Sequence, residues 1–322
     1  MNILITALGS MSAEAVISSL VKIPVVKIVG CNLYPASWTP ASRLIESFYQ
    51  VSSAKNENSY IQDVLSICQN HHINYVIPLT DPEVDVLVKY YSIFEEKGIT
   101  VCISNPTSIK IARDKYKVYK NFLKHPTITP IPSTTLREAD MNLMQFPAIL
   151  KPRFGRSSEG IHHAKNRSEL EFWQHSLKDD EYIMQPYLKG SIIVVDVVRQ
   201  PDGNDCIAIA REELVRTSNG AGITVRILPQ HQCEFLAIEV AHSLQMIGCF
   251  NIEFIVMSDQ IFLMDINPRF SAGVAFSKMS GYDMALSHLH CFTTGKIESE
   301  TSNRIEKIYT RGYIEYELKE YT

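Results

Sequence analysis

Polar side chains interrupt an apolar strand in the segment FLMDINPRFSAG, residues 262–273. Asp265 follows three apolar residues, Asn267 comes two positions later, and Arg269 lies just beyond. Side chains two residues apart on a strand point to the same face, so Asp265 and Asn267 are expected to lie together. A carboxylate and an amide at the end of an otherwise buried strand are suited to hold a cation. The alternative is a strand that simply frays into solvent.

The preceding strand carries a matching polar pair, Asn251 and Glu253. If the turn is the three residues 258–260, symmetric pairing places Glu253 opposite Asp265 and Asn251 opposite Asn267. Cross-strand partners lie roughly 5 Å apart at Cβ. Two carboxylates at that separation repel by about 3 kcal/mol at an effective dielectric near 20.

A divalent cation removes this repulsion. Two carboxylates and an amide carbonyl are hard oxygen ligands that suit Mg²⁺ or Mn²⁺. We therefore predict Glu253, Asp265 and Asn267 as metal ligands, and Arg269 is placed to reach a phosphate held by that metal. The alternative is a hairpin whose polar face is only solvated.

A second candidate segment is FPAILKPRFGRSSEG, residues 146–160. A strand ends at Lys151, and a loop of small residues flanked by arginines follows it. Small residues allow backbone N–H groups to approach an anion closely, and basic side chains supply charge, so the segment suits a triphosphate. No G-x-x-x-x-G-K-[ST] loop occurs in the chain. The alternative is an ordinary surface hairpin.

The elements that must position these segments fall into two groups. Residues 1–105 alternate between strands and helices, which predicts an α/β domain with a parallel sheet. The predicted strands there are residues 2–6, 25–31, 75–79 and 100–104, and the predicted helices are residues 13–21, 60–70 and 83–97. After a predicted helix over residues 107–124, short strands joined by hairpins follow from residue 146 onward, a pattern typical of α+β structure.

Composition excludes several classes of protein. The 322 residues are 45% hydrophobic and 20% charged, with a formal net charge of -4, and no long basic block favours nucleic acid as a partner. No apolar stretch approaches the ~20 residues of a membrane span. Seven scattered cysteines without C-x-x-C spacing favour a reduced chain, so we expect a cytoplasmic protein.

Three segments in order, KPRFGRSSEG, NIEFIV and FLMDINPRFSAGVAFSKMSGYDMA, resemble the ATP-grasp superfamily. The branch most similar to this chain is the carbamoyl-phosphate-synthetase-like and amino-acid-ligase-like one, and the resemblance covers about residues 1–295. It implies a Rossmann-like pre-ATP-grasp domain over 1–105, which includes VIPLTDPEVDVL, followed by α+β ATP-grasp domains. The implied ATP-grasp region is 106–300, with subdomains 106–185 and 186–300 and a C-terminal tail at 301–322.

The resemblance also implies roles for particular residues. Arg269, Asn267 and Lys151 match catalytic positions, with Arg269 acting on the γ-phosphate and the acyl-phosphate. Metal ligands match Glu253, Asp265 and Asn267. Nucleotide contacts match Lys115, Lys151, Arg153, Gly155, Ser157, Ser158 and Gly160, and the adenine segment matches Gln185, Pro186, Tyr187 and Leu188.

This chain departs from the pattern at three of these places, one of which is Ser157, where a Gly is usual. Ile192 stands where relatives usually carry a ribose-binding Glu, and Asp265 replaces the more common Glu. The chain is also too short for a synthetase with two ATP sites, so carbamoyl phosphate synthesis is not expected. Arg216 and Arg226 are candidates to hold a substrate carboxylate.

The implied activity is a ligase that uses ATP and Mg²⁺ (or Mn²⁺) to join a small carboxylate to an amine through an acyl-phosphate. Its partners would be these small molecules, with no nucleic acid and no membrane, and a homodimer is a candidate assembly. A phosphotransferase and a non-catalytic ATP-binding module of a larger assembly are the alternatives.

Overall fold

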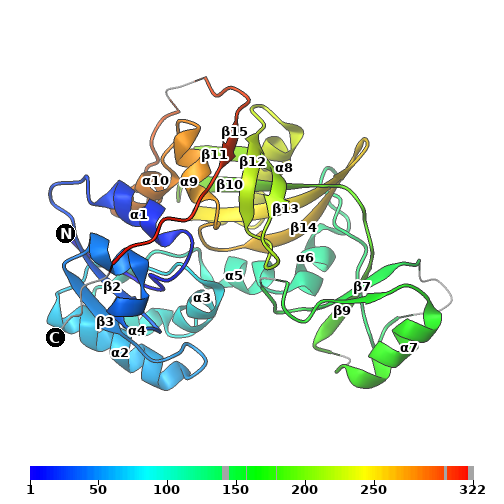
Figure 1. Cartoon of the computed structure of the whole chain (residues 1–322), viewed down its shortest axis with the longest axis horizontal. Helices are drawn as coiled ribbons and strands as arrows, with labels where there is room; N and C mark the ends of the chain where they lie inside the picture. The colour runs from blue at the N-terminus through cyan, green and yellow to red at the C-terminus, as the bar shows by residue number, and fades with distance from the viewer. Residues whose placement is uncertain (140–144, 157, 179, 301–302, 318–322) are drawn as a thin grey trace.

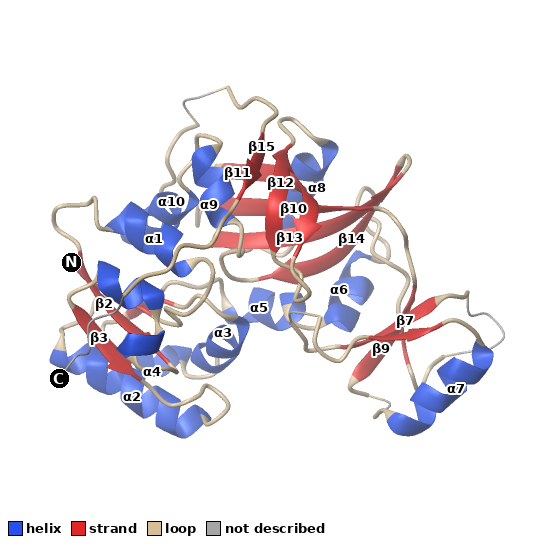
Figure 2. Ribbon diagram, in the orientation of Figure 1, coloured by secondary structure: helices blue, strands red, loops and turns tan. Residues whose placement is uncertain are grey.

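The computed structural model describes residues 1–322 except 140–144, 157, 179, 301–302 and 318–322. Its strands form three sheets of five, six and four strands. Figure 1 shows the five-stranded sheet with the N-terminus at one side, the six-stranded sheet in the middle, and the four-stranded sheet at the far side. Figure 2 shows helices covering each of them.

The N-terminal sheet is parallel in the pairs β1–β2, β1–β4, β2–β3 and β4–β5, as the sequence predicts. Its strand order is β3-β2-β1-β4-β5. The strands are β1 (Asn2–Ile5), β2 (Lys27–Asn32), β3 (Ser47–Gln50), β4 (Tyr75–Ile77) and β5 (Thr100–Val101). The helices are α1 (Ala13–Leu20), α2 (Glu57–Asn70), α3 (Asp81–Leu87) and α4 (Tyr91–Glu96), with short 3-10 turns η1 (Ala36–Trp38) and η2 (Pro40–Leu44).

The predicted helix over 107–124 is two helices, α5 (Pro106–Ala112) and α6 (Lys115–Phe122). Asp114 separates them because its backbone is extended and its carboxylate accepts hydrogen bonds from the N–H groups of Tyr116 and Lys117. An aspartate in this position caps a new helix. Lys115 is consequently the first residue of α6 and not a residue in the middle of a longer helix.

The four-stranded sheet has the order β6-β9-β7-β8 and packs against one helix. Its elements are β6 (Thr134–Thr135), β7 (Ala148–Pro152), β8 (His162–Ala164), α7 (Arg167–Ser176) and β9 (Tyr182–Pro186). Leu150, Leu170 and Met184 are buried between the sheet and α7. β7 ends just after Lys151, so the sheet sets where that side chain begins and where the Gly/Ser loop starts.

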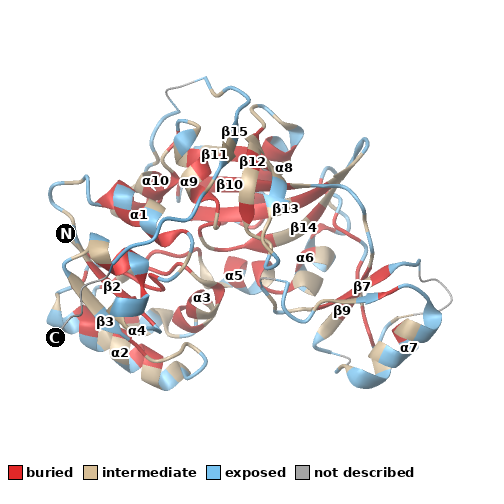
Figure 3. Ribbon diagram, in the orientation of Figure 1, coloured by how far each residue is buried: buried red, intermediate tan, exposed pale blue. Residues whose placement is uncertain are grey.

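The six-stranded sheet, ordered β14-β13-β10-β11-β12-β15, is the larger half of the α+β region. Its elements are β10 (Ser191–Arg199), β11 (Cys206–Arg216), β12 (Gly222–Ile227), α8 (Gln232–Ser243), β13 (Gly248–Met257), β14 (Gln260–Asn267), α9 (Val274–Met279), α10 (Met284–Thr293) and β15 (Ile308–Thr310). Helices α5, α6 and α8 lie over part of its apolar surface (Figure 3), and β15 falls within the predicted tail.

The β13–β14 hairpin has the predicted pairing of polar residues, but a different turn produces it. Glu253 is opposite Asp265 and Asn251 is opposite Asn267, as predicted. However, Met257 pairs with Gln260, so the turn has two residues rather than three, and the register shifts between Glu253 and Phe254. This β-bulge adds back the residue that the shorter turn removes.

No helix in the described part of the chain is long and apolar enough to cross a bilayer.

Candidate functional site

A cavity of about 510 Å³ lies where the three sheets meet. The N-terminal domain contributes the β1–α1 loop and the start of α3, the four-stranded sheet contributes the end of β7 and its loop, and the six-stranded sheet contributes one face. Eight of the predicted site residues line this cavity: Lys115, Lys151, Gly155, Ser158, Glu253, Asp265, Asn267 and Arg269. Residues from positions 115 to 269 are therefore brought together, as the resemblance implies.

The two predicted metal-binding carboxylates lie opposite each other across β13 and β14. Burial raises the pKa of Glu253, and Asp265 adds to the rise while Arg216 opposes it. Lys115 Nζ is 3.1 Å from Asp265 Oδ2, and Arg216 Nη2 is 3.4 Å from Glu253 Oε2. Each carboxylate is thus partly neutralised by one cation, which is how the pair is tolerated in this structure.

Lys151 is the most deeply buried cation among the predicted phosphate ligands. Its side chain is only 7% exposed, and burial lowers its pKa to about 8, with Lys115 adding to the drop and Asp265 opposing it. Desolvation disfavours the ammonium form until an anion arrives. Lys115 also lines the cavity and donates to the Gly155 carbonyl at 3.4 Å, so the two lysines and the loop contribute to the same cavity.

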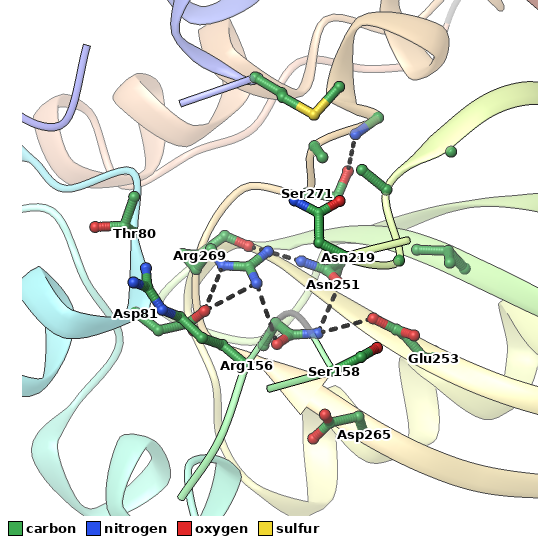
Figure 4. Close-up of a pocket in the computed structure, with 18 of the residues that line it drawn as sticks. Thr80, Asp81, Arg156, Ser158, Asn219, Asn251, Glu253, Asp265, Arg269 and Ser271 are labelled. Carbon is green, nitrogen blue, oxygen red and sulfur yellow. Dashed lines mark hydrogen bonds and ion pairs between the residues drawn. The ribbon is translucent and has the colours of Figure 1, made fainter. Parts of the chain in front are cut away.

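Asn267 and Arg269 follow Asp265 in the chain and also line the cavity, and Figure 4 shows Arg269 together with Glu253 and Asp265. Asn267 Nδ2 donates to Asn251 Oδ1 at 3.1 Å and to Glu253 Oε1 at 3.3 Å, and its Oδ1 accepts from Arg269 Nη2 at 3.3 Å. The guanidinium of Arg269 is turned toward Asp81 of the N-terminal domain. Burial raises the pKa of Asp81, whereas the nearby cations Arg269 and Arg113 lower it. The net shift is downward, so Asp81 is an anion at neutral pH.

The Gly/Ser loop reaches the cavity through Gly155 and Ser158. Gly160 lines a smaller neighbouring cavity instead. Its φ is +71°, and a Cβ there would lie 3.0 Å from both Pro152 Cγ and Tyr182 Oη, so a side chain would be strained. The prediction for Ser157 lies outside the described residues.

Two groups of predicted nucleotide ligands are not part of the cavity lining. Arg153 donates from Nη2 to Asp114 Oδ2 at 2.7 Å and from Nε to Asp114 Oδ1 at 3.2 Å, so it is committed to the cap of α6. Gln185 is buried and donates to Ser133 Oγ at 2.7 Å. Pro186, Tyr187 and Leu188 follow it at the end of β9, and Tyr187 N–H bonds the Pro147 carbonyl.

The cavity residues that the sequence did not indicate include Asp81, Arg211 and Glu213. Arg211 is 1% exposed and pairs with Asp196 at 2.8 Å and with Glu213 at 3.1 Å. The only local sequence feature that points to Arg211 and Glu213 is a basic and an acidic residue two positions apart on β11, in AREE. No local sequence feature points to Asp81, because its partner Arg269 is 188 positions away.

Comparison with known proteins agrees with this arrangement. An ATP-grasp domain model matches residues 112–273, which is half of the chain. The chain belongs to the ATP-grasp family. A model of the PylC-like N-terminal domain matches residues 3–102. The resemblance and the fold class predicted from the sequence are therefore confirmed, and ATP is confirmed as the nucleotide of the family.

Relatives and solved structures extend the comparison to most of the chain. The carbamoyl phosphate synthase large chain of Agathobacter rectalis is 29% identical over 154 residues, which is 44% of this ATP-grasp chain but only 14% of that relative. Biotin carboxylase from Campylobacter jejuni, in a β-γ-ATP complex, has a TM-score of 0.78 at 17% identity and covers 96% of this chain and 75% of its own. N5-carboxyaminoimidazole synthetase from Staphylococcus aureus, complexed with ADP, gives 0.75 at 17% identity over 95% and 81%.

The donor set fits a hard cation held jointly with phosphates. Within the described residues, no group of three or more His, Cys, Asp or Glu side chains could hold a metal alone. Glu253 and Asp265 provide two carboxylates at one position of the hairpin, and Asn267 lies next to them. A Mg²⁺ ion commonly takes one or two protein carboxylates and completes its shell with phosphate oxygens and water. This matches the predicted cofactor pair of ATP and Mg²⁺.

Proposed function

We propose that this protein is an ATP- and Mg²⁺-dependent carboxylate–amine ligase that acts on a small metabolite or amino acid through an acyl-phosphate. The observation that carries the proposal is the cavity in which Lys115, Lys151 and Arg269 face Glu253 and Asp265. Three cations beside two paired carboxylates match a bound metal and a transferring phosphoryl group. The ligase family to which the chain belongs supports the same reading.

Each side chain has a distinct task in this proposal. Lys115 and Lys151 bind phosphate oxygens, and Lys115 must exchange its present partner, Asp265, for the nucleotide. Glu253, Asp265 and Asn267 would hold Mg²⁺, which supplies charge neutralisation for the phosphates. Arg269 stabilises the charge that develops on the γ-phosphoryl group as the substrate carboxylate attacks it.

The carboxylate gains the phosphoryl group and ADP leaves. The amine then attacks the acyl carbon, forming the C–N bond and releasing phosphate. The Gly/Ser loop, including Gly155 and Ser158, would cover the phosphates and exclude water.

Five further predictions remain part of the proposal. We place adenine at Gln185–Leu188. Because position 192 is Ile192 and not a Glu, we expect other groups to hold the ribose. We keep the predicted division into 1–105, 106–300 and 301–322. The seven free cysteines fit a reducing compartment, so we place the reaction in the cytoplasm, and a homodimer is compatible with the predicted function.

The experiment that tests this function measures ADP release with Mg-ATP across a matrix of small carboxylates and amines. We expect turnover that needs one acid and one amine together. Turnover with a single acceptor and a stable phosphorylated product would support the phosphotransferase. ATP binding without turnover for any combination would favour the non-catalytic module.

A further inference from the structure

Two oppositely charged residues of β11, Glu213 and Arg216, both line the cavity. They are three positions apart, and side chains an odd number apart on a regular strand point to opposite faces. The pairing of β11 with β12 shifts register between Glu213 and Val215 and again between Val215 and Arg216. A β-bulge of this kind re-aims side chains and is common beside active sites. The irregularity thus brings an anion and a cation to one wall.

Glu213 has an acceptor that the protein leaves unused. Its side chain is 2% exposed, and its Oε1 accepts from Arg211 Nε at 3.1 Å. Its Oε2 is buried without a hydrogen-bond partner among the described residues. Buried carboxylate oxygens are normally paired, so an unpaired oxygen on a side chain that lines the cavity marks a place for a ligand's donor.

Gly222 makes room beside this oxygen. It also lines the cavity, and a Cβ at Gly222 would lie 2.0 Å from Glu213 Oε2. Any other residue would push the carboxylate away, because real atoms do not approach so closely. The glycine therefore preserves the position of Oε2.

The local charge indicates which kind of donor is missing. Arg211 is shared between Asp196 and Glu213, so this buried group has one cation and two anions. Arg311, another cation of the region, donates to the Ala272 carbonyl at 2.7 Å. A neutral hydroxyl would supply a hydrogen bond to Oε2 but no charge, whereas an ammonium group supplies both.

Arg216 is in contact with one of the predicted metal ligands, Glu253. Its Nε donates to the Gly220 carbonyl at 2.9 Å and its Nη2 is 3.4 Å from Glu253 Oε2. A guanidinium has five donors, so Arg216 retains capacity for a carboxylate beside the phosphate site. Arg226, the other sequence candidate, is not among the residues of the cavity lining and lies near Glu212 and Glu306 instead.

We propose that Glu213 and Arg216 recognise an amino acid zwitterion, with its ammonium group on Glu213 Oε2 and its carboxylate beside Arg216. This inference rests on the proposed ligase function and narrows its substrate. The carboxylate that is phosphorylated belongs to a molecule with a protonated amino group nearby, and acids without that group are discriminated against.

The test compares the standard amino acids, in both enantiomers, with their des-amino analogues, such as alanine with propionate and phenylalanine with 3-phenylpropionate. Binding is measured by calorimetry in the presence of Mg-ADP, and ADP release is measured separately with Mg-ATP. We expect at least one amino acid to bind roughly 10- to 100-fold more tightly than its analogue. Glu213→Gln should reduce that ratio to about one, since an amide lacks the negative charge.

Two variants complete the test. Gly222→Ala displaces the carboxylate without removing it and should also abolish the discrimination. Glu212→Gln is the matched control, because Glu212 is adjacent on β11 but bonds Ser191 and does not belong to the cavity lining, so it should retain the ratio.

The inference and the ligase function fail in different ways. Three results would overturn the zwitterion site. They are equal binding of amino acids and their analogues, discrimination that survives in Glu213→Gln, and no binding of any amino acid. Selective binding that is lost in Glu213→Gln without any ADP release supports the site and contradicts the ligase. ADP release that does not depend on the amino group supports the ligase and contradicts the zwitterion site.

Discussion

Arg269 donates two hydrogen bonds to a single oxygen of Asp81, from Nε at 3.1 Å and from Nη2 at 2.9 Å. The arginine follows β14 of the six-stranded sheet, and the aspartate begins α3 of the N-terminal domain. Asp81 also lies 3.3 Å from Arg113 Nη1. The N-terminal domain therefore fixes the direction of the guanidinium that we assign to the phosphoryl group.

Replacing Asp81 by Asn should lower kcat for ADP release by roughly 10- to 100-fold, because a misdirected catalytic group loses its orientation. The KM for ATP should change less, since Lys115 and Lys151 remain. Steady-state kinetics separate the two constants. The control is Asp85→Asn, which removes a partner of Arg113 only. An equal loss in both variants would show that Asp81 acts through stability alone.

Lys151 should make nucleotide binding sensitive to pH. Its pKa is about 8, below its ordinary value, so the ammonium form is present below pH 8 and is lost as the pH rises through that value. Affinity for ATP should therefore fall by about tenfold between pH 7 and pH 9. Titration of the protein with ATP across this range measures it. Lys151→Gln should bind ATP more weakly and with a flat profile, and a wild-type slope in that variant would contradict the assignment.

Asp265→Asn should remove most of the Mg²⁺-dependent ADP release, by about 100-fold or more, because one of the two metal carboxylates is lost. Chelation of Mg²⁺ by EDTA should have the same effect on the wild-type protein. Asp259→Asn, in the exposed turn of the same hairpin, is the matched control. Full activity of Asp265→Asn at ordinary Mg²⁺ concentrations would remove Asp265 from the metal site.

The buried cluster of Arg211, Asp196 and Glu213 should dominate local stability. Arg211→Met leaves two buried carboxylates without their cation, which costs about 3–5 kcal/mol in the free energy of unfolding. Urea denaturation measures the change. Arg167→Ala breaks an exposed pair with Glu171 and should cost no more than about 0.5 kcal/mol. Similar midpoints for the two variants would show that the cluster contributes little.

The sequence predicts the elements that have strong local patterns. The parallel N-terminal sheet and the β13–β14 hairpin follow from apolar runs and turn residues, and the pairing of Glu253 with Asp265 is confirmed. The predicted turn length is wrong, and the pairing still holds because a bulge opposite Glu253 offsets the shorter turn. Bulges depend on packing across the sheet, which a single strand's pattern does not contain.

The rest of the site depends on contacts between distant parts of the chain. Asp81 becomes part of the site only because α3 meets the end of β14. Arg153 is of a residue type that binds phosphate, but its guanidinium is paired with Asp114, the residue between α5 and α6. In both cases the residue type was visible in the sequence, whereas its partner was set by tertiary packing.

The long strands β12 and β14, near the two ends of the six-stranded sheet, are each paired along part of their outer side. β15 pairs with the outer side of β12, and the segment around Thr129 and Ile131 exchanges backbone hydrogen bonds with Leu263 of β14. Exposed sheet edges invite strands from other molecules. Along these covered stretches the backbone is already paired, so a second copy of this chain would have to associate there through side-chain surfaces rather than by extending the sheet.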